Sequence, residues 1–168
     1  MAERPIVIYG NPVLRKKSEP VDGINQEVKD LVSDLTDTLK KAKGLGLSAV
    51  QIGVLKRVFI VDLTAVDVNE SLRVYINPEI IEKDGEVTYE EGCLSFPGIY
   101  QNVTRPGQVK VRATDLDGKV FEQVAEGLAG RAILHEYDHL EGKLFIDYLS
   151  SISRTLLKGR LKKLAEAS

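Results

Sequence analysis

The chain has 168 residues, of which 43% are hydrophobic and 29% are charged, and its net charge is −2. This composition is typical of a folded globular protein with one domain, and it excludes an intrinsically disordered chain. A slightly acidic protein lacks the clustered positive field that draws proteins to DNA or to a membrane surface. We therefore expect a single domain over residues 1–168 and neither DNA nor a membrane as partner.

The N-terminal segment carries no obvious targeting signal. Residues 1–20 contain one short apolar run, residues 6–9, which is too short for a signal peptide or a membrane span. We therefore expect a cytoplasmic protein of bacterial type. A protein of an organelle whose transit peptide had been removed would show the same sequence, so that origin stays open.

Three helices are predicted from the spacing of apolar residues. Asn25 is a favourable N-cap, and the apolar residues after it recur at intervals of three and four until Gly44, where the helix can stop. A second helix is expected over about residues 126–140, with Gly142 as its stop, and a third over about residues 152–167. The first of these is amphipathic, and its apolar face consists of Val28, Leu31, Val32, Leu35, Leu39 and Ala42.

Between the first two helices the pattern changes to that of strands. We predict strands at residues 57–63, 74–82 and 86–89, and a hairpin of residues 109–115 with 120–124. Asp117-Gly118 is typical of a two-residue hairpin turn. A helix, several strands and another helix do not match the regular alternation of a parallel α/β sheet. We therefore predict an α+β fold, with antiparallel sheets packed around a central helix.

The most informative motif is His135-Glu136-Tyr137-Asp138-His139, an H-E-x-x-H sequence on the second predicted helix. Residues four apart on a helix leave the same face, so the two imidazoles can converge on one metal ion. Glu136 can reach a water molecule beside the ion without being a ligand, which suits a general base and then a general acid. The motif therefore predicts metal-dependent hydrolysis on the central helix.

A third ligand is needed, and the lone cysteine is the candidate. Cys93 lies in the segment Glu91-Gly92-Cys93-Leu94-Ser95, at the end of a predicted strand. One thiolate and two imidazoles leave a fourth tetrahedral position for water, as a hydrolytic centre requires. A thiolate ligand is compatible with zinc, ferrous iron, cobalt or nickel, and poorly suited to magnesium or calcium.

The third element is the glycine-rich segment at residues 44–51, which follows the first helix directly. Its small residues let a ligand approach the backbone closely, and Gln51 offers a neutral amide donor for a developing oxyanion. Taken alone, such a segment is more often a helix end and a turn.

Together these segments resemble the three signature motifs of the peptide deformylase family. The motifs are G-x-G-L-x-A-x-Q at residues 44–51, E-G-C-L-S at residues 91–95 and H-E-x-D-H at residues 135–139. Residues 8–14, 77–80 and 140–150 also look like that family, so the resemblance covers nearly the whole chain. It implies a metallohydrolase that removes the N-formyl group from the N-formylmethionine of nascent polypeptides and releases formate.

The resemblance also implies residue roles. Cys93, His135 and His139 would bind the metal, and Glu136 would be the acid/base. Gln51 and the backbone N–H of Leu94 would stabilise the oxyanion, and the main chain of Gly46 would bind the substrate backbone. The family usually contains Fe(II), which zinc, nickel or cobalt can replace. Two departures affect no such role: Ser48 stands where alanine is more usual, and Leu134 where glutamine is common.

Further residues are nominated around this site. Because ligating imidazoles usually donate their other N–H to an acceptor, Glu91 and Asp138, with Arg105, are candidates for a layer of side chains that orients the ligands. For the methionine pocket we nominate Ile99, Ile133 and Leu134, although each is also an ordinary core residue.

The third predicted helix is rich in lysine and arginine. Deformylases with such a tail can dock on the ribosome, so a ribosomal partner is a reasonable hypothesis, and a solvated amphipathic helix is an equal alternative. Its basic residues are Arg154, Lys158, Arg160, Lys162 and Lys163.

Three other readings of the motifs are possible. A zinc peptidase of the H-E-x-x-H type would use Glu141 or Asp147 as its third ligand and leave Cys93 without a role. A catalytically silent binding module would keep only a structural metal. A cysteine hydrolase would use Cys93 with a histidine and would need no metal.

Overall fold

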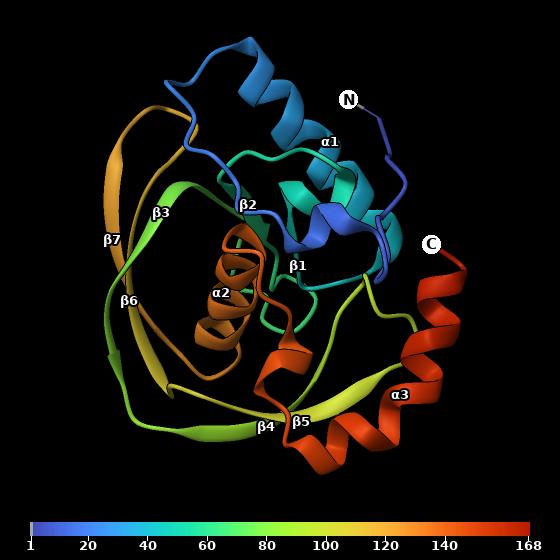
Figure 1. Ribbon diagram of the computed structural model, residues 1–168. Helices are drawn as coiled ribbons and strands as arrows, with labels where there is room; N and C mark the ends of the chain where they lie inside the picture. Colours follow the sequence, from blue (N-terminus) through green and yellow to red (C-terminus); the bar gives the residue numbers. More distant parts are fainter. Residues whose placement is uncertain (1) are drawn as a thin grey trace.

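The computed structural model describes residues 2–168 and has two antiparallel sheets (Figure 1). The main sheet has the strand order β1-β2-β3-β6-β7, in which β1 is Gly46–Ser48, β2 is Val58–Val61, β3 is Arg73–Asp84, β6 is Gln108–Thr114 and β7 is Val120–Glu126. The second sheet pairs β4 (Val87–Gly92) with β5 (Tyr100–Arg105). The predicted α+β class with antiparallel sheets is confirmed.

Three α-helices and three short 3-10 helices complete the chain. The α-helices are α1 (Gln26–Ala42), α2 (Gly127–Leu140) and α3 (Ser151–Glu166), and the 3-10 helices are η1 (Pro12–Arg15), η2 (Ala49–Ile52) and η3 (Phe145–Tyr148). Figure 1 shows β3, β6 and β7 curving around one side of α2, while α1 and α3 lie at the periphery of the molecule. Within residues 2–168, no helix combines the length and the apolar character needed to cross a bilayer.

Strand β2 separates two parts of the hydrophobic core. All of its residues are buried, and they alternate between two faces, as successive side chains of a strand do. Val58 and Ile60 pack in the cluster that contains the apolar face of α1. Phe59 and Val61 pack in the cluster that contains α2. Both faces of the sheet are therefore covered at this point, which explains the uninterrupted apolar run in the sequence.

A third apolar cluster attaches the C-terminal helix to the body. Leu157 and Leu161 of α3 pack there with Leu14 of η1 and Phe145 of η3. Phe96, which follows the lone cysteine, lies in the same cluster and makes an edge-to-face contact with Phe145 at a centroid distance of 5.0 Å. The cluster therefore connects α3 to the segment that carries Cys93.

The first helix begins as predicted but ends differently. The side chain of Asn25 accepts a hydrogen bond from the N–H of Val28 at 3.0 Å, which confirms the N-cap. The left-handed residue at its end is Lys43, with a φ of 59°, and not Gly44. Gly44 serves close packing instead, because an added Cβ would lie 2.8 Å from Cδ1 of Leu94.

The connection between β6 and β7 is longer than the predicted two-residue turn. The strands end at Thr114 and begin again at Val120. Between them the carboxylate of Asp115 accepts hydrogen bonds from the N–H groups of Asp117 and Lys119, so a side-chain acceptor organises a wider loop. The sequence pattern also does not predict β1 or β5, because β1 has only three residues and β5 is mostly polar.

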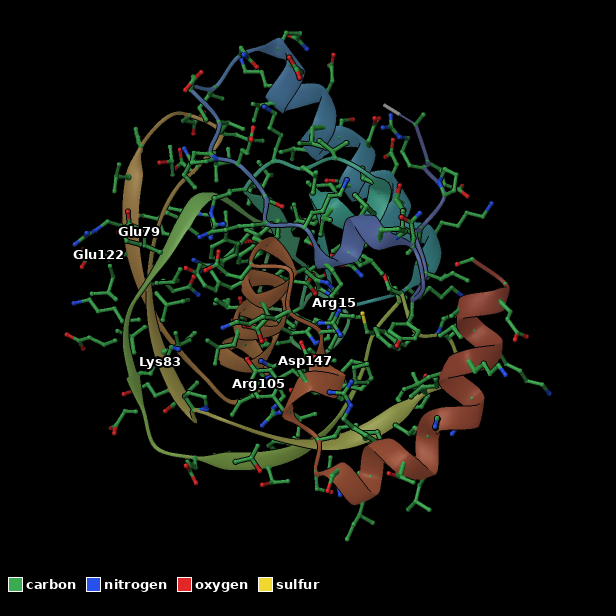
Figure 2. All side chains as sticks on the ribbon, viewed as in Figure 1. Arg15, Glu79, Lys83, Arg105, Glu122 and Asp147 are labelled. Atoms are coloured by element: carbon green, nitrogen blue, oxygen red, sulfur yellow. The ribbon has the colours of Figure 1, made fainter. Side chains whose placement is uncertain are left out.

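An ion pair joins η1 to η3. Arg15 donates hydrogen bonds to both carboxylate oxygens of Asp147, at 2.7 and 3.0 Å, and Figure 2 shows the two side chains next to each other. Asp147 also accepts the N–H of Leu144 at 3.0 Å. These contacts hold the N-terminal segment against the chain that follows α2.

Gly142, just after α2, allows the backbone at Arg15 to lie close to the chain that follows α2. Its φ is 75°, and an added Cβ would lie 2.6 Å from the carbonyl oxygen of Arg15. Gly142→Ala should therefore lower the free energy of unfolding by about 2 to 4 kcal/mol, from left-handed backbone strain plus overpacking. Urea denaturation measures the change.

Gly53→Ala is the matched control. Gly53 has a φ of 85°, but apart from Gly53 and its two chain neighbours no heavy atom of residues 2–168 would lie within 4 Å of an added Cβ. This variant should therefore lose only the backbone contribution, about 1 kcal/mol. Equal losses in the two variants would show that the contact with Arg15 is unimportant.

Candidate active site

The structure brings the three predicted metal ligands together. The possible ligand atoms of Cys93, His135 and His139 all lie within 4.8 Å of one another. The Sγ of Cys93 is 3.3 Å from Nε2 of His139. The two imidazole rings, one helical turn apart on α2, have their centroids 5.0 Å apart. One thiolate and two imidazoles at this spacing suit a single transition-metal ion with an open fourth position.

Separate elements deliver these ligands. The two histidines project from α2, while Cys93 follows directly after β4, in the hairpin formed by β4 and β5. Gly92 pairs with Tyr100 across this hairpin, and an added Cβ on Gly92 would lie 2.5 Å from the tyrosine ring. A glycine before the cysteine therefore lets the hairpin close against Tyr100.

His135 is held from behind by a carboxylate. Its Nδ1 lies 3.0 Å from Oε1 of Glu91, so the other ring nitrogen, Nε2, is left for a metal ion. Burial of Glu91 disfavours its charged form, but the hydrogen bonds from His135 and Arg105 outweigh this effect and lower the pKa of Glu91 to about 2. Glu91 is therefore ionised at neutral pH and places a negative charge behind His135.

Arg105 connects Glu91 to the helix. Its Nε donates to Oε2 of Glu91 at 2.6 Å, and its Nη1 donates to Oδ2 of Asp138 at 2.7 Å. The hydroxyl of Tyr148 donates to the same oxygen of Asp138 at 2.7 Å. Glu91, Asp138 and Arg105, the candidates from the sequence, thus form one hydrogen-bonded group next to His135, and Tyr148 joins it. Figure 2 labels Arg105 at the lower end of α2.

Glu136 points into the site and is largely unengaged. It is 4% exposed, and within residues 2–168 no partner accepts or donates a hydrogen bond at its Oε1. An unpaired buried carboxylate oxygen is costly, so it is suited to accept a proton or a hydrogen bond from a bound molecule. Burial raises the pKa of Glu136 to about 7, although the charges of His135 and Arg105 act in the opposite direction.

Gln51 is oriented by Ser48, one of the two residues that depart from the family pattern. Its Oε1 accepts hydrogen bonds from the backbone N–H of Ser48 at 3.0 Å and from the Ser48 hydroxyl at 3.1 Å. Its Nε2 then points the other way, 3.1 Å from Oγ of Ser95 and 3.6 Å from Sγ of Cys93. The amide donor therefore faces the metal-binding residues.

One pocket of about 510 Å³ is lined by Gln51, Glu91, Cys93, His135 and Glu136. Gly46, Gln51, Leu94 and Glu136 all border it, as the motifs predict. Its apolar wall is formed by Leu45, Phe96, Tyr100, Leu128 and Ala132.

The nominated pocket residues Ile99, Ile133 and Leu134 lie elsewhere. Ile133 and Leu134 are buried in the cluster between α2 and the main sheet, and Ile99 is buried in the cluster under α3. Their contact with a substrate stays a prediction. Leu45 and Leu128 were missed because Leu45 lies within the glycine-rich segment and Leu128 begins a helix, positions at which hydrophobic periodicity carries little information.

Sequence reasoning also missed Arg131. This arginine is 7% exposed, lies one turn before His135 on α2 and borders the same pocket. A charged residue between apolar positions of a buried helix is unusual, and that is the signal that could have identified it.

The ligands required by the peptidase reading are engaged elsewhere. Oε2 of Glu141 lies 2.8 Å from Nη1 of Arg57, and Asp147 binds Arg15. Neither carboxylate is among the residues that gather with His135 and His139, whereas Cys93 is.

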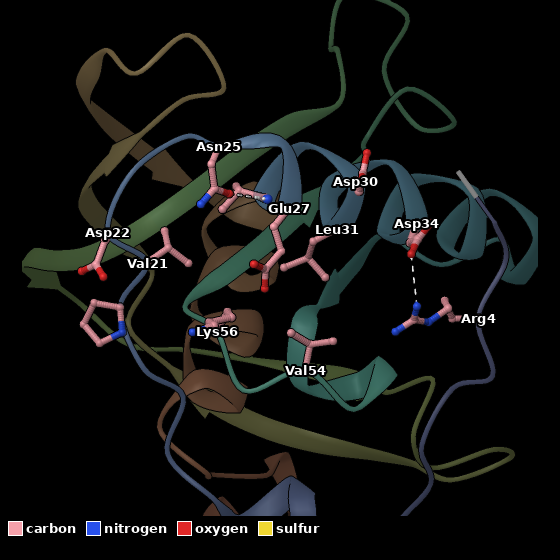
Figure 3. A pocket seen from close by; sticks show the side chains of 12 residues that line it. Arg4, Val21, Asp22, Asn25, Glu27, Asp30, Leu31, Asp34, Val54 and Lys56 are labelled. Atoms are coloured by element: carbon pink, nitrogen blue, oxygen red, sulfur yellow. Dashed lines mark hydrogen bonds and ion pairs between the residues drawn. The ribbon is translucent and has the colours of Figure 1, made fainter.

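A second hollow, of about 420 Å³, lies between α1 and the segments that carry Val21 and Val54 (Figure 3). Arg4 and Asp34 form a hydrogen bond of 3.3 Å at one end of it. None of the residues that the motifs single out borders this hollow. The chemistry is therefore concentrated in the pocket beside α2.

Comparisons with known proteins agree with this geometry. The family model for polypeptide deformylase matches residues 3–155. The peptide deformylase of Acidobacterium capsulatum is 46% identical over 167 residues, which is 99% of this chain and 98% of that protein. The peptide deformylase of Alkalilimnicola ehrlichii is 43% identical over 164 residues, with 98% of this chain and 92% of that protein covered.

Solved structures give the same result. The crystal structure of a peptide deformylase from Legionella pneumophila superimposes with a TM-score of 0.91 at 40% identity, covering 99% of this chain and 97% of that one. The peptide deformylase from Thermus thermophilus also gives a TM-score of 0.91, at 34% identity, with 98% of this chain and 99% of that one covered. The chain therefore belongs to the polypeptide deformylase family, metal-dependent hydrolases that remove the formyl group from the N-formylmethionine of nascent polypeptides.

Proposed function

We propose that one divalent metal ion, Fe(II) in the cell, is held by Cys93, His135 and His139 in a single catalytic domain of residues 1–168. The observation that carries this proposal is the gathering of the three ligand side chains within 4.8 Å, next to the unpartnered carboxylate of Glu136. The thiolate favours Fe(II), zinc, nickel or cobalt over magnesium. When bound, the ion supplies Lewis acidity and lowers the pKa of water.

Glu136 moves the proton in this proposal. Its buried carboxylate takes a proton from the attacking water and then gives it to the nitrogen of the methionine that leaves. A pKa of about 7 lets the group do both near neutral pH. The products are formate and a polypeptide with a free amino terminus.

Gln51 and Leu94 stabilise the negative charge that develops on the formyl oxygen. The amide of Gln51 is oriented by Ser48 so that Nε2, a donor, faces the pocket. The backbone N–H of Leu94, next to Cys93, is the second donor, and Leu94 borders the same pocket. Preorganised donors of this kind stabilise an oxyanion in the transition state without reorganisation.

The methionine side chain occupies the apolar wall of the pocket. Leu45, Leu128 and Ala132 line this wall, and an unbranched thioether fits an irregular apolar surface of this kind. The main chain of Gly46 borders the pocket from β1 and binds the backbone of the formyl-Met polypeptide.

The ribosome is a proposed partner, and the bacterial cytoplasm the proposed location. Both relatives described above are bacterial. Arg154, Lys158 and Lys162 follow one another at intervals of four on α3 and line a groove beside Tyr9. Exposed cations in such a row attract the phosphates of ribosomal RNA.

The metal and acid/base assignments can be tested by formate release from a formyl-Met-Ala peptide with anaerobically purified protein. Glu136→Gln should retain the metal and lose activity by at least about 100-fold, because proton transfer is removed. Cys93→Ala should lose the metal and the activity together. A Cys93→Ala protein that kept full activity would favour the peptidase reading, and activity after chelation would favour the cysteine hydrolase.

Gly46→Ala tests the space that Glu136 requires. An added Cβ at Gly46 would lie 2.8 Å from Oε2 and 3.0 Å from Cγ of Glu136, so the side chain of Glu136 must move. We expect kcat to fall about 10-fold or more, since small displacements of a catalytic group are costly, while metal content and thermal stability change little.

The control for Gly46→Ala is the same substitution in a Glu136→Gln background. If the methyl acts by displacing Glu136, the second substitution should add little further loss. Losses that multiply would instead indicate that the backbone of Gly46 binds the substrate independently.

Ribosome docking is tested by co-sedimentation at low and high salt. Lys158→Glu with Lys162→Glu reverses two exposed charges on α3 without removing the buried Leu157 and Leu161. The variant should lose binding to ribosomes, whereas Lys83→Glu with Lys119→Glu should keep it, because these exposed lysines lie on β3 and in the loop between β6 and β7. Equal loss in both variants would indicate nonspecific attraction.

A further inference from the structure

We propose that Arg131 is a positioning residue that sets the geometry of the metal centre by joining the helix of the histidines to the hairpin of the cysteine. The inference rests on the proposed ligand set of Cys93, His135 and His139. Arg131 lies on α2, one turn before His135, and is 7% exposed. Its guanidinium contacts three groups that lead to the ligands by two routes.

The first route runs through Glu91 to His135. Nη1 of Arg131 donates to Oε2 of Glu91, and Oε1 of the same carboxylate lies 3.0 Å from Nδ1 of His135. One side of the carboxylate is therefore held by Arg131 while the other orients the imidazole. Partners of this kind fix the ring orientation of a ligating histidine.

The second route runs through the backbone to Cys93. Nη1 of Arg131 donates to the carbonyl oxygen of Val103 at 3.0 Å, and Nη2 donates to that of Val87 at 2.7 Å. Val87 belongs to β4 and Val103 to β5, the paired strands of the hairpin. Because Cys93 follows directly after β4, a side chain that fixes this hairpin against α2 also fixes the distance between Sγ and the imidazoles.

The chemistry of arginine suits this role. A planar guanidinium can donate to a carboxylate and to two carbonyl groups in fixed directions, which an ammonium group cannot reproduce. The ring of Tyr89, on β4, lies 5.4 Å from the guanidinium carbon and covers it from the outside. Glu91 also accepts a hydrogen bond from Arg105. The buried carboxylate therefore still has a positively charged partner, and the Glu91–Arg105 ion pair remains, when Arg131 is replaced.

A purely structural role is the alternative, and Arg57 provides the matched control. Arg57 is also nearly buried, at 9% exposed. It also donates to two backbone carbonyls, of Ser18 and Leu140, and to one carboxylate, of Glu141. It has the same kinds of partners as Arg131 but does not contact Glu91.

The experiment compares Arg131→Met and Arg131→Lys with Arg57→Met and Arg57→Lys in the full chain loaded with Co(II). Its readouts are the dissociation constant for Co(II), the visible spectrum of the thiolate-bound ion, and the melting temperature. For Arg131 we expect both substitutions to weaken Co(II) binding by about 10- to 100-fold and to shift the spectrum. For Arg57 we expect a lower melting temperature with binding and spectrum unchanged.

Unchanged binding and spectrum in the Arg131 variants would overturn the inference, as would equal changes in the Arg57 variants. If Arg131→Met does not fold, the Lys pair decides, because it keeps the positive charge in both positions. Two controls are measured alongside: Cys93→Ala must abolish the thiolate spectrum, and His135→Ala must abolish tight binding. Failure of either control would refute the proposed ligand set and the inference with it, whereas unchanged Arg131 variants with both controls as expected would refute the inference alone.

Discussion

The structure depends on the compensation of buried charge around Glu91. A carboxylate that is nearly inaccessible is destabilising unless oppositely charged donors surround it. Here both arginines and the imidazole of His135 converge on its two oxygens. Each donor belongs to a different element or a different turn: Arg105 to β5, Arg131 and His135 to α2. A single anion therefore fixes how the helix and the small sheet meet.

The two sheets serve this arrangement in different ways. The main sheet packs against the apolar side of α2, which includes Ile133, Leu134 and Leu140. The small sheet meets the opposite side of α2, where the partners are charged and polar. One face of α2 thus contributes to hydrophobic stability, and the other contributes to a polar network. Such a network makes the structure rigid only when every member has a hydrogen-bond partner.

Local sequence signals predicted much of this protein. The N-cap and the periodicity of α1, and the spacing of His135 and His139 on α2, are properties of neighbouring residues. The joining of Cys93 to these histidines followed from the need for a third ligand and from the resemblance to a family. The α+β class followed from element order.

The features that were not predicted depend on long-range packing. The role that we infer for Arg131 depends on its hydrogen bonds to Val87, Glu91 and Val103, which are 28 to 44 residues away in sequence. Hydrophobic periodicity cannot predict such contacts. The apolar wall with Leu45 and Leu128 likewise exists only where the end of α1, the start of α2 and the hairpin meet. The end of α1 was mispredicted for the same reason. The helix ends at Lys43, and Gly44 instead leaves space for the side chain of Leu94, which is distant in sequence.

The hydrogen bonds of Ser48 to Gln51 have one further consequence. Two donors occupy Oε1, and one of them, the backbone N–H of Ser48, cannot accept a hydrogen bond. Rotation of the side-chain amide by half a turn would place the NH₂ group against this N–H, which is repulsive. The glutamine is therefore locked in one of its two nearly isosteric orientations, and the pocket offers a bound carbonyl a hydrogen-bond polarity that cannot reverse.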